Sequence, residues 1–134
     1  MNTIERFLGT YHGTGSWHDA AGKSGSYAIR QTNTARSDGF EVAFHHDFDD
    51  ATVIDARFTM TWIAPHIFRV DVAGSAVGHG SVFDSHCHYH LNIGGKFIEV
   101  GYRAEIDAIE VFGSSSTNAE GNYTAWRERV QRTA

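Results

Sequence analysis

The stretch that decides the fold is residues 40–62, which read FEVAFHHDFDDATVIDARFTMTW. Apart from His46, hydrophobic side chains occupy every second position over 40–48 and 54–62, on the two sides of the Asp-Asp pair at 49–50. A period of two is typical of a β-strand that buries one face and exposes the other. The stretch therefore predicts two strands, 40–48 and 52–62, joined by a turn at the aspartates.

The same pattern continues along the whole chain. Short alternating segments are separated by Gly, Asp and Asn turns, and the 14 glycines and single proline suit such a design. Residues 2–8 predict a short helical turn, because Ile4, Phe7 and Leu8 share one side. The strands that we expect cover 9–17, 24–33, 40–48, 52–62, 66–72, 76–83, 84–92, 97–104, 108–113 and 122–130.

This arrangement predicts one all-β domain that spans residues 1–134. An open sheet of about ten strands would leave two unpaired edges, so closure into an antiparallel up-and-down barrel is expected. A barrel of that size is wide enough to leave an interior cavity instead of a filled core. Cavities of this kind are the usual place for a small-molecule ligand.

Composition narrows the function classes. The net charge is −5, and no clustered run of Lys and Arg offers a surface for phosphates, so we expect no nucleic-acid partner. No apolar stretch approaches the ~20 residues that cross a bilayer. Residues 1–20 lack the basic and apolar segments of a signal peptide, and one cysteine cannot form an internal disulfide. We expect a cytoplasmic protein of bacterial type.

The first strand resembles a known family. Its Gly9-Thr10-Tyr11 is similar to the Gly-x-Trp signature that opens the calycins, which include lipocalins and fatty-acid-binding proteins. With two further glycines it resembles the opening of nitrobindin-like and bacterial lipocalin-like barrels. Trp126-Arg127 resembles the calycin habit of packing a late arginine across the first-strand aromatic ring. The resemblance implies a barrel with a ligand cavity. Nitrobindin-like proteins bind haem through a histidine near the C-terminus, and residues 91–134 contain none.

The run 85–91, SHCHYHL, places three histidines on one face of a strand. The apolar faces of the neighbouring strands favour Cys87, Tyr89 and Leu91 as the inward set, with the histidines in solvent. The alternative inverts the strand, and the outward Tyr89 and Leu91 then need cover, as in a homodimer. Two of the histidines and one from another strand, such as His46 or His79, would then bind a divalent metal, or a histidine would bind haem. The three residues concerned are His86, His88 and His90.

Inward parity also selects the candidate site. The expected function is binding of a small apolar or aromatic molecule, with no cofactor. The alternative is a cofactor-independent enzyme of isomerase, cyclase or hydratase/lyase type, in which His46 and Tyr102 exchange protons with the substrate. The sequence leaves open whether there is catalysis. The candidate ligand-binding residues are Phe44, Met60, Trp62, Tyr89, Tyr102 and Trp126.

Overall fold

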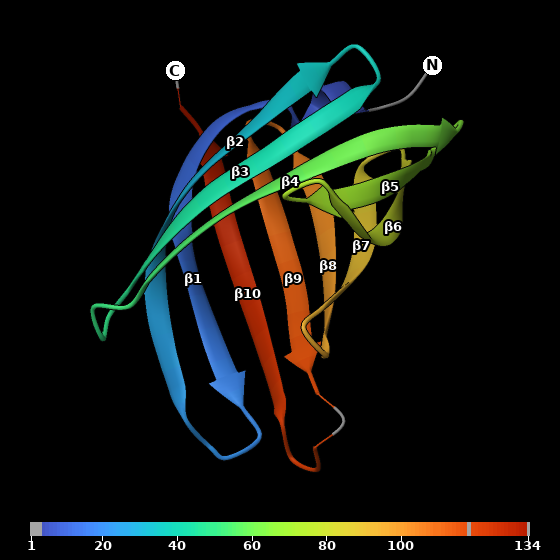
Figure 1. Ribbon diagram of the computed structural model, residues 1–134. Helices are drawn as coiled ribbons and strands as arrows, with labels where there is room; N and C mark the ends of the chain where they lie inside the picture. The colour runs from blue at the N-terminus through green and yellow to red at the C-terminus, as the bar shows by residue number, and fades with distance from the viewer. Residues whose placement is uncertain (1–3, 118, 134) are drawn as a thin grey trace.

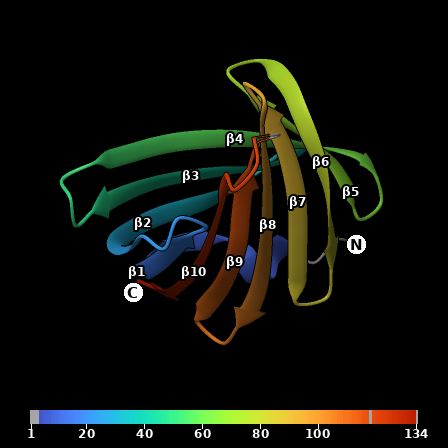
Figure 2. The ribbon, with the colours of Figure 1, turned by 90° about the horizontal axis from the view of Figure 1, so that it is seen from below.

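The protein is a closed antiparallel barrel of ten strands preceded by one turn of 3-10 helix (Figure 1). The computed structural model describes residues 4–117 and 119–133. Each strand pairs with its neighbours in the sequence, and β1 pairs with β10 to close the ring. Figure 2 shows this ring from below. The expected single all-β, up-and-down barrel is confirmed, and no open sheet edge remains among its ten strands.

The elements follow the predicted order closely. The predicted helical turn over 2–8 is observed as η1 at Ile4–Phe7, and residues 2 and 3 of that prediction lie outside the described residues. The strands are β1 (Gly9–Asp19), β2 (Ser24–Arg36), β3 (Gly39–Phe48), β4 (Val53–Ala64), β5 (Ile67–Val72), β6 (Ser75–Phe83), β7 (His86–Ile93), β8 (Lys96–Glu105), β9 (Ala108–Ser116) and β10 (Tyr123–Arg132).

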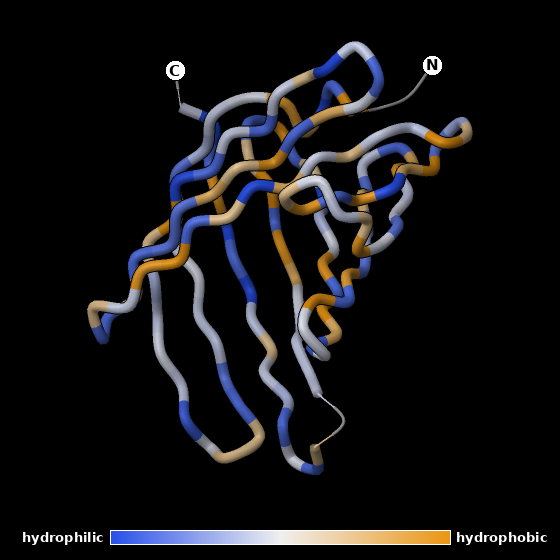
Figure 3. The backbone as a smooth tube through the Cα atoms, in the orientation of Figure 1, coloured by the Kyte–Doolittle hydropathy of each residue, from blue (hydrophilic) through white to orange (hydrophobic). Residues whose placement is uncertain are grey.

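Alternation builds the core. Hydrophobic and hydrophilic residues alternate along the strands in Figure 3, so the hydrophobic side chains share the face of the sheet that lines the barrel interior. On β7 the buried residues are Cys87, Tyr89 and Leu91, as the neighbouring strands predict. The three histidines of this strand therefore project from the outer face.

Helix η1 closes one end of the barrel. Its Phe7 is buried and packs against the ring of Tyr102, with 6.2 Å between the ring centroids. Asn33 on β2 fixes the helix by donating from Nδ2 to the Phe7 carbonyl at 2.7 Å. The amide of Gln31 donates to the Asn33 side chain and to the Tyr102 hydroxyl, so these buried polar groups satisfy one another. No helix among the described residues is long and apolar enough to span a membrane.

An arginine does pack across the first-strand aromatic ring, but it is not the expected one. Arg132 lies over the ring of Tyr11 at 5.4 Å and donates to its hydroxyl at 2.8 Å. The pairing of β1 with β10 explains the correction, because Tyr11 lies opposite Arg132 and Arg127 lies opposite Ser16. Arg127 instead packs on Phe112 on the outer surface.

Candidate ligand cavity

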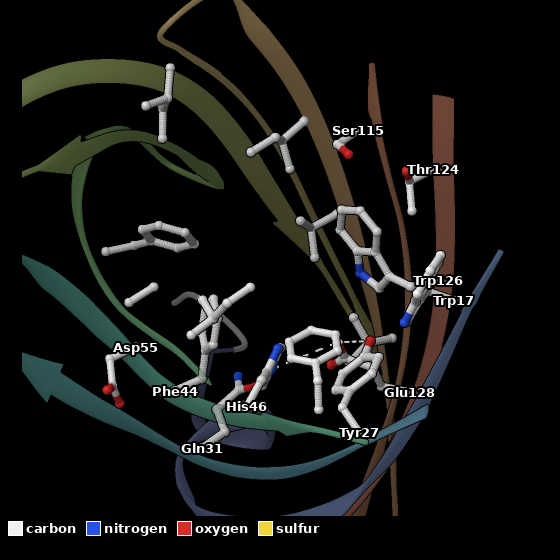
Figure 4. A pocket seen from close by; sticks show the side chains of 18 of the residues that line it. Trp17, Tyr27, Gln31, Phe44, His46, Asp55, Ser115, Thr124, Trp126 and Glu128 are labelled. Atoms are coloured by element: carbon white, nitrogen blue, oxygen red, sulfur yellow. Dashed lines mark hydrogen bonds and ion pairs between the residues drawn. The ribbon is translucent and has the colours of Figure 1, made fainter. Parts of the chain in front are cut away.

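A cavity of about 710 Å³ occupies the barrel interior. Its wall includes Tyr89 and Tyr102 toward the end that η1 closes. At the other end it reaches Trp17, Lys96 and Thr124, near the end of β1 and the starts of β8 and β10. Figure 4 shows the part of this wall where polar and aromatic side chains meet. The volume lies within the range of about 300–1,000 Å³ that is common for small-molecule sites.

The polar part of the wall centres on Glu128 of β10. Glu128 is only 5% exposed, and its Oε2 accepts a hydrogen bond of 2.6 Å from the hydroxyl of Tyr27 on β2. The Nε2 atom of His46 on β3 lies 3.9 Å from the same oxygen. These three side chains come from separate strands and converge on one spot, as Figure 4 shows.

Aromatic rings surround His46. Its ring lies 4.4 Å from that of Phe44 and 4.8 Å from that of Tyr27, and Phe48 contacts it edge-on. This apolar setting disfavours the charged imidazolium, and burial, with a smaller effect of the nearby His45, lowers the pKa of His46 to about 4. Among the described residues, its buried Nε2 has no hydrogen-bond partner.

Burial acts in the opposite sense on the carboxyl group. It raises the pKa of Glu128 to about 7, although the hydrogen bond from Tyr27 lowers it in part. The distance of 3.9 Å between His46 and Glu128 is that of an ion pair. With these pKa values, however, the two side chains are not charged together: both are neutral between about pH 4 and 7, and above that range only the carboxylate carries charge.

Glycines make room for the large rings of the wall. A Cβ atom at Gly113 would lie 2.2 Å from the Trp126 ring, and one at Gly25 would lie 2.6 Å from Nε1 of Trp17. Such distances are far below van der Waals contact, so both indoles lie flat against bare backbone. Trp17 and Trp126 are also direct partners between β1 and β10. The position of this tryptophan pair thus depends on glycines in the adjacent strands β2 and β9.

Four of the six predicted ligand-binding residues line the cavity, namely Phe44, Tyr89, Tyr102 and Trp126. Met60 and Trp62 do not border it. Met60 is fully buried in the packed core, and Trp62 packs on Phe40 and Phe68. Both sit on the C-terminal half of β4, where side chains fill the barrel, whereas the cavity is bordered by β4 residues up to Phe58.

The predicted catalytic pair is not joined in the structure. His46 lines the cavity next to Glu128. Tyr102 also lines it, but its hydroxyl bonds to Tyr89 at 3.0 Å and accepts from Gln31 at 3.2 Å. Burial raises the pKa of the Tyr102 phenol above its ordinary value, which makes proton loss from it unfavourable near neutrality.

Sequence reasoning missed Glu128, the residue at the centre of the polar group. Its parity on β10 matches that of Trp126 and Val130, so the period of two marks it as inward. The run Arg127-Glu128-Arg129 resembles a solvated charged segment and conceals this signal. Tyr27 and Trp17 have inward parity as well. Nothing in the sequence indicates that Tyr27 meets a buried carboxyl group or that Trp17 lies opposite a second tryptophan.

The histidines of the alternative metal site lie on the outer surface. His86 and His88 are exposed and His90 is half-buried. His90 lies opposite His79 of β6, with 6.4 Å between their ring centroids. In the part of the chain that the structure describes, no three His, Cys, Asp or Glu side chains are placed to hold one metal ion.

No protein-family model and no curated protein sequence matches the chain, but solved structures do. The S-type phycobiliprotein lyase CpeS from Guillardia theta is similar over 100% of this chain and 94% of its own, with a TM-score of 0.78 at 14% identity. Rv2717c from M. tuberculosis is similar over 98% of this chain and 95% of its own, with a TM-score of 0.72 at 12% identity. A mutant of the fluorescent protein UnaG is similar over 98% of this chain and 99% of its own, with a TM-score of 0.53 at 10% identity.

The fold is calycin-like. The closed ten-strand barrel and these three neighbours agree with the resemblance of the first strand. At such low identity the similarity extends to the fold alone. The function of this calycin-like barrel therefore has to be inferred from the residues of its own cavity.

Proposed function

We propose that the barrel binds a small, flat, partly aromatic molecule in its interior cavity. The observation that carries this proposal is the cavity itself, about 710 Å³ in volume and bordered by the rings of Trp17, Phe44, Phe58 and Trp126. Flat rings favour contact with other flat rings, and burial of apolar surface supplies the main driving force. The few polar groups on the inner wall would orient the ligand.

Two neighbours support the class of ligand. One is named a phycobiliprotein lyase and another a fluorescent protein. These names favour a conjugated ring system over an aliphatic chain, in agreement with the rings on the wall of this cavity. The proposal for this chain is binding of such a molecule, without a commitment to either named activity.

Fluorescence of N-phenyl-1-naphthylamine, a neutral apolar dye, tests the proposal. We expect saturable emission on binding to the protein, and loss of that emission in Ser115→Trp, because Ser115 lines the cavity and the added indole would fill it. Ser114→Trp is the matched control, since Ser114 is the preceding residue of β9 and lies opposite Glu99 of β8. If Ser115→Trp keeps the same emission as Ser114→Trp and the wild type, the dye binds outside the cavity and the proposal is refuted. Native mass spectrometry of untagged protein would show any co-purified molecule.

A second candidate is an enzyme that uses acid–base chemistry. It is favoured by the proximity of Glu128 and His46, whose pKa values burial drives in opposite directions. Such a pair can donate a proton from the carboxylic acid and accept one at the imidazole. Glu128 thus replaces Tyr102 as the partner of His46 in this hypothesis.

Deuterium exchange separates the two functions. Under the enzyme hypothesis, a co-purified molecule held in D₂O gains deuterium at carbon in the wild type, and about 10²–10⁴ times more slowly in His46→Gln. Under binding alone, neither protein introduces deuterium at carbon.

A further inference from the structure

The buried carboxyl group of Glu128 has little to balance it. Among the hydrogen bonds of the described residues it accepts one, from Tyr27, whereas an ionised carboxylate can accept about four. Beyond Tyr27, the imidazole of His46 lies 3.9 Å away and is neutral near pH 7, so it supplies no balancing charge. An ionised carboxylate in this position is stabilised by any donor that enters the cavity.

Cationic side chains lie away from this position. Of the described lysines and arginines, Arg57 and Lys96 border the cavity, and both are exposed. Arg57 is paired with Glu41 of β3. The inner wall therefore lacks the arginine or lysine that a buried ligand carboxylate would need.

The Nε2 atom of His46 adds a second unmet requirement beside the first. It is buried, lacks a hydrogen-bond partner among the described residues, and lies 3.9 Å from Glu128 Oε2. A neutral imidazole has one donor and one acceptor nitrogen. A ligand group between these two side chains could donate to the carboxylate and satisfy the imidazole as well.

We infer that the ligand presents an N–H or cationic nitrogen donor to Glu128 and His46, and that the inner wall rejects ligands that place a carboxylate there. This inference rests on the proposed function, because it assigns the polar end of the molecule that the cavity would bind. It divides ligands of one shape by their head group. An amine, amidine or ring N–H is accepted, whereas the anionic head of a fatty acid is not.

Three naphthalenes that share one ring system test the inference by displacing the dye at about pH 8, where Glu128 is ionised. They are 2-methylnaphthalene, 2-(naphthalen-2-yl)ethylamine and naphthalen-2-ylacetate. A hydrogen bond to a charged group contributes about 1.5–3 kcal/mol, so the amine should bind about 10- to 150-fold more tightly than methylnaphthalene. The acetate should bind more weakly than methylnaphthalene.

Variants assign the preference to its source. Glu128→Gln should abolish the advantage of the amine over methylnaphthalene, whereas Glu99→Gln, a control whose side chain is exposed on β8, should leave the affinities of both compounds unchanged. Tyr27→Phe removes the internal donor to the carboxyl group. Because that hydrogen bond lowers the pKa of Glu128, ionisation moves to higher pH in the variant, and there the advantage of the amine should persist or grow. An amine without advantage in the wild type, or an advantage that survives Glu128→Gln, would overturn the inference. Failure of methylnaphthalene itself to displace the dye would instead refute the proposed function.

Discussion

Glu128 and His46 should change the free energy of unfolding in opposite directions as the pH rises. The folded barrel holds Glu128 with a pKa near 7, compared with an ordinary value of 4.5. Its contribution to the free energy of unfolding is therefore fully present below about pH 4.5 and is lost as the pH rises through about 7. His46 has a pKa near 4 in place of 6.5, so its contribution is present above about pH 6.5 and is lost as the pH falls through about 4.

The two contributions are similar in size. At about 1.36 kcal/mol per pKa unit, each amounts to about 3 kcal/mol. Between about pH 4.5 and 6.5 the slopes have opposite signs and largely cancel in the wild type. Replacing one residue should expose the slope of the other. As the pH rises from about 4.5 to 7, the free energy of unfolding of Glu128→Gln should increase by about 3 kcal/mol relative to that of the wild type. As the pH rises from about 4 to 6.5, that of His46→Gln should decrease by about 3 kcal/mol relative to that of the wild type.

Urea unfolding at half-unit steps from about pH 4 to 8 measures these differences. Glu99→Gln and His88→Gln serve as controls on the outer surface, and each should follow the wild-type curve within about 0.5 kcal/mol. The double variant reports the coupling of the pair, since residues in contact are rarely additive. If the curves of Glu128→Gln and His46→Gln run parallel to that of the wild type, neither group has the displaced pKa that its burial implies.

Two further predictions concern the wall and the outer face. Gly113→Ala should displace the Trp126 ring and weaken binding of the apolar dye at least about 10-fold. The control Gly101→Ala, whose added Cβ would lie 3.9 Å from its nearest atom, should bind the dye as the wild type does. Equal affinities of the two variants would show that the position of the tryptophan does not affect binding. The triple replacement of His86, His88 and His90 by Gln should leave dye affinity unchanged. Metal analysis and absorption spectra of untagged wild-type protein should show no stoichiometric metal or haem. A bound metal that is lost in the triple variant would support the metal hypothesis instead.

Much of the fold follows from the period-two pattern alone. Alternation over 40–62 and in the neighbouring segments locates the strands. Because open sheet edges would expose unpaired backbone groups, the number of strands predicts a closed barrel. The same parity correctly turns His46 and Tyr89 inward. These successes share one cause, since the face of a strand is a local property that successive side chains record directly.

The position of a residue along the barrel is not local, and there the sequence was insufficient. Met60 and Phe58 have the same parity, but only Phe58 borders the cavity, because the packed and hollow parts of the interior depend on side chains from other strands. Arg132 instead of Arg127 reaches Tyr11 because the register of β1 against β10 decides it. Glu128 was overlooked because charge usually signals exposure, and its burial only becomes apparent once Tyr27 and His46 are placed around it.

A crystal structure with 2-(naphthalen-2-yl)ethylamine bound at about pH 8 tests the central claim most directly. We predict that the ring system lies inside the barrel and that the amine nitrogen is about 2.7–2.9 Å from a carboxylate oxygen of Glu128. A ring system on the outer surface would contradict this claim. So would an amine that bonds to the exposed carboxylates of Asp50 and Asp55 at the cavity rim while Glu128 keeps Tyr27 as its single partner.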